Sequence, residues 1–350
     1  MKRFNIGIIG YGGMGSYHHK SIPLPCGLRF ISAYDINPKR LEKAKESGLT
    51  AYENLDVFLS DPRLDVVLIA TPNSSHKKLA IRAMNAHKHV ICEKPVALNC
   101  NEFEEMLKAS KNNGVLFTVH QNRRMDEDFR IIKKLYDENG LGEVFRIESR
   151  AQGSRGIANT WRRKKEYGGG MLYDWGVHLI DRVLWMIDSP VTSVYAEFQH
   201  VNHTEVDDNF RLTLTFKNGI SALIEIGTCN YIMHPIWYVA GKNATAQIDY
   251  WNLTGKILRL IDNDIKFEDE IKPSVAGPSI TLAPRAADTV EELPLPKVKT
   301  DQGFFYKNFY NALCGKAPLI VKPNEVRRTM QIIDLAFRSG EKNQVIKCEI

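Results

Sequence analysis

The sequence predicts an α/β protein of two domains, a doubly wound parallel sheet followed by an α+β domain with an open-faced, mostly antiparallel sheet. Three observations lead to this fold class. Strand-like and helix-like segments alternate over the first third of the chain, a glycine-rich turn follows the first strand, and short strands follow one another directly in the second half. The length of 350 residues also suits about two domains, at roughly 150 residues each.

The first domain is expected to span residues 1–122. Its strand-like runs are almost continuously apolar, as in a sheet that helices cover on both faces. Helical spacing connects them, for example at 74–86 and 99–112. The predicted strands are 6–9, 30–34, 66–70, 89–92 and 116–119.

The second domain is expected to span residues 123–350. Helices are predicted at 126–136, 171–187, 301–314 and 324–338, and strands at 144–151, 192–199, 209–216, 220–228, 236–240, 245–250 and 256–261. Short turns between consecutive strands indicate antiparallel neighbours. If the free face of this sheet is broad and apolar, another subunit would cover it. Residues 266–299 hold five prolines and are expected to form an irregular excursion.

Composition excludes several classes of protein. The formal net charge of +6 is too small to indicate a nucleic-acid partner. No run approaches the ~18 apolar residues of a membrane helix, and the apolar start lacks a signal cleavage site. The six cysteines form no Cys-x-x-Cys pair, and His200 and His203 find no third ligand, so neither disulfides nor a metal site are expected. We expect a cytoplasmic protein.

The glycine-rich turn carries the clearest binding signal. Gly10, Gly12 and Gly15, with Gly13 and Met14 between them, end the first strand and start a helix whose free N–H groups suit a pyrophosphate. Asp35 follows 20 residues later, where a carboxylate accepts from the adenosine ribose hydroxyls and repels a 2′-phosphate. NAD is therefore favoured over NADP, although Lys39 and Arg40 stand close to Asp35. Taken alone, Asp35 could equally cap the next helix.

Further polar residues follow the next strands, at the edge where parallel sheets bind ligands. Thr71, Asn73 and His76 follow the third predicted strand and can also start a helix. Glu93 and Lys94 follow the fourth, and Asn122 follows the fifth, where it could border the cofactor. A lysine at a strand end is otherwise an ordinary surface residue.

A second constellation lies in the helix predicted at 171–187. Asp174, His178 and Asp181 have the spacing of one helix face. An Asp beside a His on a buried helix either has a function or tightens the helix locally. In the preceding loop, Trp161 and Arg162 could stack on and hydrogen-bond a polyol or the nicotinamide carboxamide.

The motifs GYGGMG, TPNSSH, EKP and GGGMLYDWGVHLID, in this order, resemble those of the Gfo/Idh/MocA family (glucose–fructose oxidoreductase, inositol dehydrogenase and rhizopine catabolism). The resemblance spans nearly the whole chain. It implies a Rossmann first domain, a catalytic trio of Lys94, Asp174 and His178, and a cis bond before Pro95. It also implies that the C-terminal sheet forms a homodimer or homotetramer.

Oxidation of a secondary alcohol needs a hydride acceptor and a base that removes the hydroxyl proton. His178 could be that base with Lys94 polarising the oxygen, or Lys94 could relay the proton. The leading hypothesis is an NAD(P)-dependent dehydrogenase that acts on a hydroxyl or ketone of a sugar, inositol or related polyol. The alternatives are a redox-assisted glycoside lyase or hydrolase acting through a 3-keto sugar, and a non-catalytic sensor of NAD or sugar.

Overall fold

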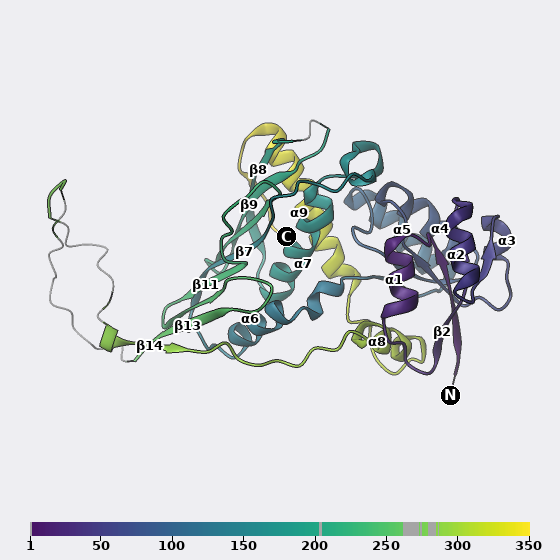
Figure 1. The fold of residues 1–350 in the computed structure, drawn as a ribbon, viewed down its shortest axis with the longest axis horizontal. Coiled ribbons are helices and arrows are strands. Elements are labelled where there is room, and N and C mark those ends of the chain that lie inside the picture. Colours follow the sequence, from purple (N-terminus) through teal and green to yellow (C-terminus); the bar gives the residue numbers. More distant parts are fainter. Residues whose placement is uncertain (1, 203–204, 262–272, 274, 279–284, 286) are drawn as a thin grey trace.

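The computed structural model describes the chain except residues 1, 203–204, 262–272, 274, 279–284 and 286. Two sheets lie side by side, each with its own helices (Figure 1). The helices of the second half pack between its sheet and the first domain. Among the described residues, none of the helices is both long and apolar enough to cross a membrane.

The first sheet has six parallel strands in the order β3-β2-β1-β4-β5-β6. The central strands are apolar along their whole length, and every residue of β4 is buried, which confirms a doubly wound domain. The short strand β3 was not predicted, because its three residues are only half-buried or exposed. The strands are β1 Phe4–Ile9, β2 Leu28–Tyr34, β3 Thr50–Tyr52, β4 Val66–Ile69, β5 His89–Cys92 and β6 Phe117–Val119. The helices are α1 Gly13–Ser21, α2 Pro38–Glu46, α3 Leu55–Leu59, α4 His76–Asn85 and α5 Cys100–Asn113.

The second sheet has nine strands in the order β14-β13-β12-β11-β7-β10-β9-β8-β15. Among the described strands of this second sheet, only β7 and β10 pair in parallel, so the predicted, mostly antiparallel sheet is confirmed. Its strands are β7 Val144–Gln152, β8 Val191–Gln199, β9 Asn209–Phe216, β10 Ser221–Gly227, β11 Trp237–Gly241, β12 Ala244–Ile248, β13 Gly255–Leu260, β14 Val290–Leu293 and β15 Ile346–Lys347.

Part of the segment 266–299 differs from the irregular excursion that the sequence predicts. Residues 290–293 form β14, which pairs antiparallel with β13 and extends the sheet. The side chains of β14 do not alternate clearly between buried and exposed, so the sequence lacks the alternating pattern that predicts a strand. Most of residues 262–286 lie outside the described part of the chain.

Helices α6 (Glu127–Asp137), α7 (Val177–Met186) and α9 (Pro323–Lys342) cover one face of the second sheet (Figure 1). In β9, Leu212 and Leu214 are buried toward these helices, while Arg211 and Thr215 alternate with them and are exposed. The open face carries a row of ion pairs across β7, β10 and β9, made by Glu148, Arg150, Glu225 and Arg211. This face is thus charged at its centre.

A buried ion pair joins the end of the first sheet to α7. Arg124, which follows β6, donates from Nε and Nη2 to both carboxylate oxygens of Asp181 at 2.7 and 2.6 Å. Its Nη1 donates to Glu325 of α9 at 2.6 Å. Arg124 and Asp181 are 1% and 2% exposed, so the pair is shielded from water. Both carboxylate oxygens of Asp181 are thus bound to Arg124, and a shared face with Asp174 and His178 stays a prediction.

Helix α8 (Phe304–Leu313) returns to the first sheet. The Phe305 ring lies 4.7 Å from that of His120, and the Tyr306 hydroxyl lies 2.6 Å from Nδ1 of His18 in α1. A segment that follows the predicted boundary at residue 122 thus covers part of the first domain.

Candidate active site

The glycine-rich turn between β1 and α1 is shaped for a close approach to its backbone. Gly10 has a φ of +92°, and a Cβ on Gly15 would lie 2.1 Å from the Gly10 carbonyl oxygen, so both positions require glycine. A Cβ on Gly13, in contrast, would meet nothing within 4 Å. Helix α1 starts after Gly12 without a side-chain cap. The turn therefore offers open space and uncapped N–H groups to a pyrophosphate.

Asp35 lies at the end of β2, next to this turn. Its carboxylate accepts hydrogen bonds from the backbone N–H groups of Tyr11 and Asn37, both at 2.8 Å. Arg40 lies 3.5 Å away and is half-exposed. Each carboxylate oxygen keeps a second lone pair, so Asp35 can hold the turn and still accept from a ribose hydroxyl.

The polar residues that follow β4 form hydrogen bonds with other residues of the chain. The Thr71 hydroxyl lies 2.6 Å from that of Ser75, and Asn73 donates to the Gly168 carbonyl at 2.7 Å. His76 is fully buried, with its ring nitrogens 2.8 Å from the Pro95 carbonyl oxygen and 3.0 Å from that of Thr71. These bonds fix the loops around the site. A direct contact of Thr71, Asn73 or His76 with the cofactor stays a prediction.

The structure brings Lys94 and Asp174 together from the two halves of the chain. Lys94 Nζ lies 2.6 Å from the Asp174 carbonyl oxygen and 3.1 Å from its Oδ1. Arg162 Nε lies 3.1 Å from Oδ2 of the same carboxylate. Burial alone would raise the pKa of Asp174, but the two cations hold it below its usual range. The peptide bond between Lys94 and Pro95 is cis.

The segment that carries Asp174 and His178 is not a regular helix. Residues Leu172–Gly176 form a π-helical turn (η5), and α7 begins only at Val177. Such i→i+5 turns occur often at functional sites. The wider turn changes the angular spacing that a regular α-helix would give.

His178 is 5% exposed, and its Nδ1 is buried without a hydrogen-bond partner among the described residues. Burial lowers the pKa of His178 well below its usual value, and the nearby charges of Lys94 and Arg123 lower it further. The imidazole is therefore neutral at neutral pH.

Trp161 and Arg162 form the short helix η3 (Trp161–Arg163). The Arg162 guanidinium carbon lies 4.7 Å from the centre of the Trp161 ring, in cation–π contact. The structure thus brings Arg162 to Asp174 and places Trp161 beside Arg162.

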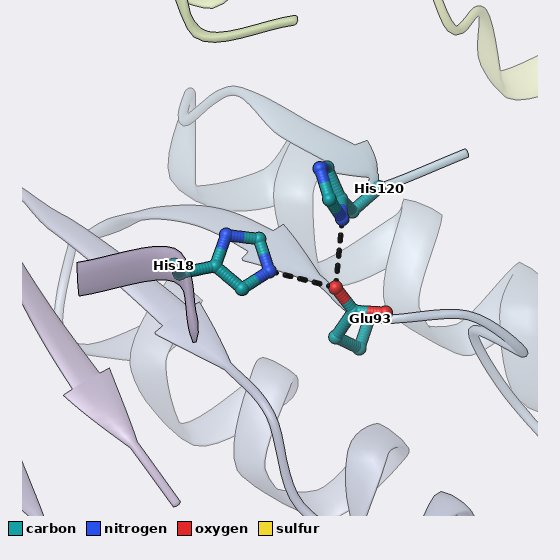
Figure 2. A group of neighbouring side chains, drawn as sticks. All are labelled: His18, Glu93 and His120. Carbon is teal, nitrogen blue, oxygen red and sulfur yellow. Dashed lines mark hydrogen bonds and ion pairs between the residues drawn. The ribbon is translucent and has the colours of Figure 1, made fainter. Parts of the chain in front are cut away.

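Sequence reasoning missed the buried cluster beneath Lys94 (Figure 2). Nε2 of His18 and Nδ1 of His120 lie 2.8 and 2.7 Å from the same oxygen of Glu93, Oε1. Since a carboxylate only accepts, both imidazoles donate. The other oxygen, Oε2, accepts from the Lys94 N–H at 3.2 Å.

Burial would raise the pKa of Glu93, but the two histidines keep it well below its usual range. His18 and His120 also have the composition of a metal-ligand set together with Glu93. In the structure, however, both rings point their nitrogens at the carboxylate oxygen itself (Figure 2). The only sequence signal for the cluster was a histidine on the first helix and another at the end of β6.

Asn122 follows β6 in the short helix η2 (Asn122–Met125). Its Oδ1 and the Oε1 of Gln121 are buried without partners among the described residues. Both residues border a cavity of about 330 Å³ between α1, η2 and the start of α8. Lys94, Asp174 and His178 do not line this cavity.

Comparison with known proteins gives two adjoining family matches. Residues 4–121 match the model of an oxidoreductase family with an NAD-binding Rossmann fold, and residues 129–247 match the GFO/IDH/MocA C-terminal domain. The chain is 28% identical to scyllo-inositol 2-dehydrogenase (NADP(+)) IolW of Bacillus subtilis, over 98% of this chain and 96% of that protein. It is 31% identical to the uncharacterized oxidoreductase YdgJ of Escherichia coli, over 96% of both. An NAD-binding protein from Listeria innocua has a similar crystal structure, with 40% identity, a TM-score of 0.96 and coverage of 99% of this chain and 100% of that one.

Proposed function

This chain belongs to the Gfo/Idh/MocA family of NAD-binding oxidoreductases, and from that premise we propose that it interconverts a secondary hydroxyl and a ketone on a sugar, inositol or related polyol. It is an NAD(P)-dependent oxidoreductase that uses NAD. The name of its relative IolW, a scyllo-inositol 2-dehydrogenase, supports a polyol substrate.

One observation carries the proposal. The Lys94 ammonium lies 3.1 Å from Oδ1 of Asp174, and its charge helps to lower the pKa of the buried His178 imidazole. Alcohol oxidation needs these groups in one place: a base for the proton, a cation for the developing alkoxide and an acceptor to orient the substrate.

We assign these roles as follows. Bound NAD supplies the carbon that accepts the hydride. His178, neutral at working pH, takes the hydroxyl proton on a ring nitrogen. Lys94 stabilises the negative charge that develops on the substrate oxygen, and Asp174 holds the ammonium and accepts from a neighbouring hydroxyl. Because its pKa is low, protonated His178 is a strong acid and readily returns the proton when a ketone is reduced.

The cofactor contacts form the second part of the proposal. The backbone at the start of α1 binds the pyrophosphate, and Asp35 binds the adenosine ribose, which favours NAD over NADP. Arg40, 3.5 Å from Asp35, is the cation that a 2′-phosphate would meet. The full set of proposed contacts is Gly10, Gly12, Gly13, Met14, Gly15, Asp35, Thr71, Asn73, His76, Glu93, Lys94, Asn122, Trp161 and Arg162.

A substrate screen tests the proposal. The protein is incubated with inositols, aldoses and glycosides in the presence of NAD or NADP, while absorbance at 340 nm and release of aglycone are recorded. Growth of the 340 nm signal with a polyol, lost in Lys94→Ala and His178→Ala, supports the dehydrogenase. Aglycone release without net NADH would instead assign the lyase or hydrolase chemistry, and nucleotide binding without any turnover would assign a sensor.

The open face of the second sheet is the proposed contact between subunits of a homodimer or homotetramer. No helix in the described part of the chain covers this face, and its ion-pair row could meet the same row of a second copy. Light scattering of the purified protein decides between these assemblies and a monomer.

A further inference from the structure

An exposed aromatic group lies beside the proposed catalytic residues, and the mechanism above does not use it. Trp175 follows Asp174 in the π-helical turn, and its ring centre lies 6.1 Å from that of His178. The ring of Trp251 lies 5.6 Å from that of Trp175. We call Trp175, Trp251 and Arg123 the aromatic wall.

Trp251 remains partly exposed although it packs against Trp175. It lies in the turn between β12 and β13, and 38% of its surface is exposed. Two backbone hydrogen bonds fix this turn, from Asp249 N–H to the Thr254 carbonyl at 2.7 Å and from Leu253 N–H to the Tyr250 carbonyl at 2.9 Å. The indole is thus presented on a defined turn, which lowers the cost of ordering it around a ligand.

Arg123 completes the wall with hydrogen-bond donors. Its guanidinium carbon lies 4.1 Å from the centre of the Trp175 ring and 5.9 Å from that of Trp251. Nη1 donates to Asp126 at 2.8 Å, which orients the group. Its Nε and Nη2 donate to no group in the described part of the chain. A planar cation with free N–H groups therefore lies next to an exposed indole.

This combination fits one chemical class of ligand. A pyranose ring has a face of C–H groups that packs on an indole, and a rim of hydroxyls that accept from a guanidinium. Trp175 is in ring contact with both His178 and Trp251, while no ring contact joins His178 to Trp251 among the described residues. Trp251 is thus one contact further from His178 than Trp175 is, where a group attached to the reacting ring could pack.

We propose that the aromatic wall is a second subsite, which binds the sugar or aromatic group attached to the reacting ring, so that the enzyme prefers glycosides to free monosaccharides and inositols. The inference rests on the proposed function for the position of the reacting ring. It assigns specificity to the β12–β13 turn.

The test measures binding to the NADH-loaded protein by isothermal titration calorimetry. The single-ring probes are glucose and scyllo-inositol, and the extended probes are cellobiose, lactose and 4-nitrophenyl β-D-glucoside. We expect at least one extended probe to bind about tenfold more tightly than the single-ring probes, equivalent to ~1.4 kcal/mol. Trp251→Ala should abolish this preference without changing the NADH affinity, and Trp251→Phe should keep most of it. Tyr250→Ala, a change to an exposed neighbour in the same turn, is the matched control and should bind like the wild type.

Three results would overturn the inference: no extended probe binds more tightly than the single rings, Tyr250→Ala and Trp251→Ala lose the preference equally, or Trp251→Ala alters the subunit assembly in light scattering and leaves sugar binding intact. Failure of the proposed function looks different. In that case extended probes still bind in a Trp251-dependent way, but no hydride transfer appears at 340 nm.

Discussion

Replacement of Arg124 by methionine tests how the two halves of the active site are held in register. The side chain is 1% exposed, and it neutralises Asp181 of α7, which is 2% exposed, and Glu325 of α9. Methionine fills most of the volume but leaves the Asp181 carboxylate buried and unpaired. Removing one partner of a buried pair costs about 3–5 kcal/mol.

The expected change in melting temperature follows from the size of the chain. An unfolding entropy of about 2.1 cal/mol/K per residue gives about 0.7 kcal/mol/K for 350 residues, so Arg124→Met should lower the Tm by about 4–7 °C. Scanning calorimetry measures this shift. The double variant Arg124→Met with Asp181→Asn removes the unpaired charge and should recover part of the loss.

A Tm loss below about 1 °C in the single variant, equivalent to ~0.7 kcal/mol, would refute this reasoning. A double variant no more stable than the single one would refute the part assigned to the unpaired carboxylate.

Four further predictions concern the site. Lys94→Met should lower kcat for hydride transfer at least about 100-fold, with a much smaller loss of NADH affinity in a fluorescence titration. Equal losses in both would place Lys94 in cofactor binding alone. In oxidation, kcat/KM should stay constant as the pH falls through 6.5, because the lowered pKa of His178 keeps the base deprotonated there. The value of kcat/KM should decrease only at lower pH. A decrease centred at pH 6.5 argues against His178 as the base. Oδ2 of the buried Asp207 accepts from the N–H of Leu172 in the π-helical turn at 2.7 Å. Burial raises the pKa of Asp207 to about 7, so the wild type loses stability as pH rises from about 4 to about 7. The Tm of Asp207→Asn relative to wild type should therefore rise across that window and level off above it, and a constant difference contradicts the assignment. Gly15→Ala should lower the Tm, because its Cβ would lie 2.1 Å from the Gly10 carbonyl oxygen. Gly13→Ala should leave the Tm unchanged, because its Cβ would meet nothing within 4 Å. Equal changes in Tm in the two variants would show that the backbone of the turn moves to accommodate a side chain at Gly15.

The parallel sheet could be predicted from the sequence because each central strand is apolar throughout and a helix follows it. Strand β14 could not, since its residues pair at the sheet edge with little alternation in burial. The same holds for β15, which has only two residues. Edge strands depend on a neighbour for their pairing, and a local pattern does not contain that neighbour.

In the candidate site, too, some features follow from a local sequence pattern and others arise only in the folded chain. Lys94, Asp174 and His178 were singled out by their motifs, and the structure places Lys94 against Asp174. The hydrogen bonds that join Glu93 to His18 and His120 span 75 and 27 residues, so they arise only from the folded topology. The π-helical turn is equally invisible in sequence, where four-residue spacing indicates a regular helix.

The return of α8 to the first sheet has a practical consequence for dissecting the protein. A fragment cut after residue 122 would lack Tyr306 and Phe305, leaving His18 without the hydroxyl that meets it and the ring of His120 uncovered. The nucleotide-binding half is therefore not a self-sufficient module, and chimaeras that exchange it between relatives must carry residues 304–313 along with it.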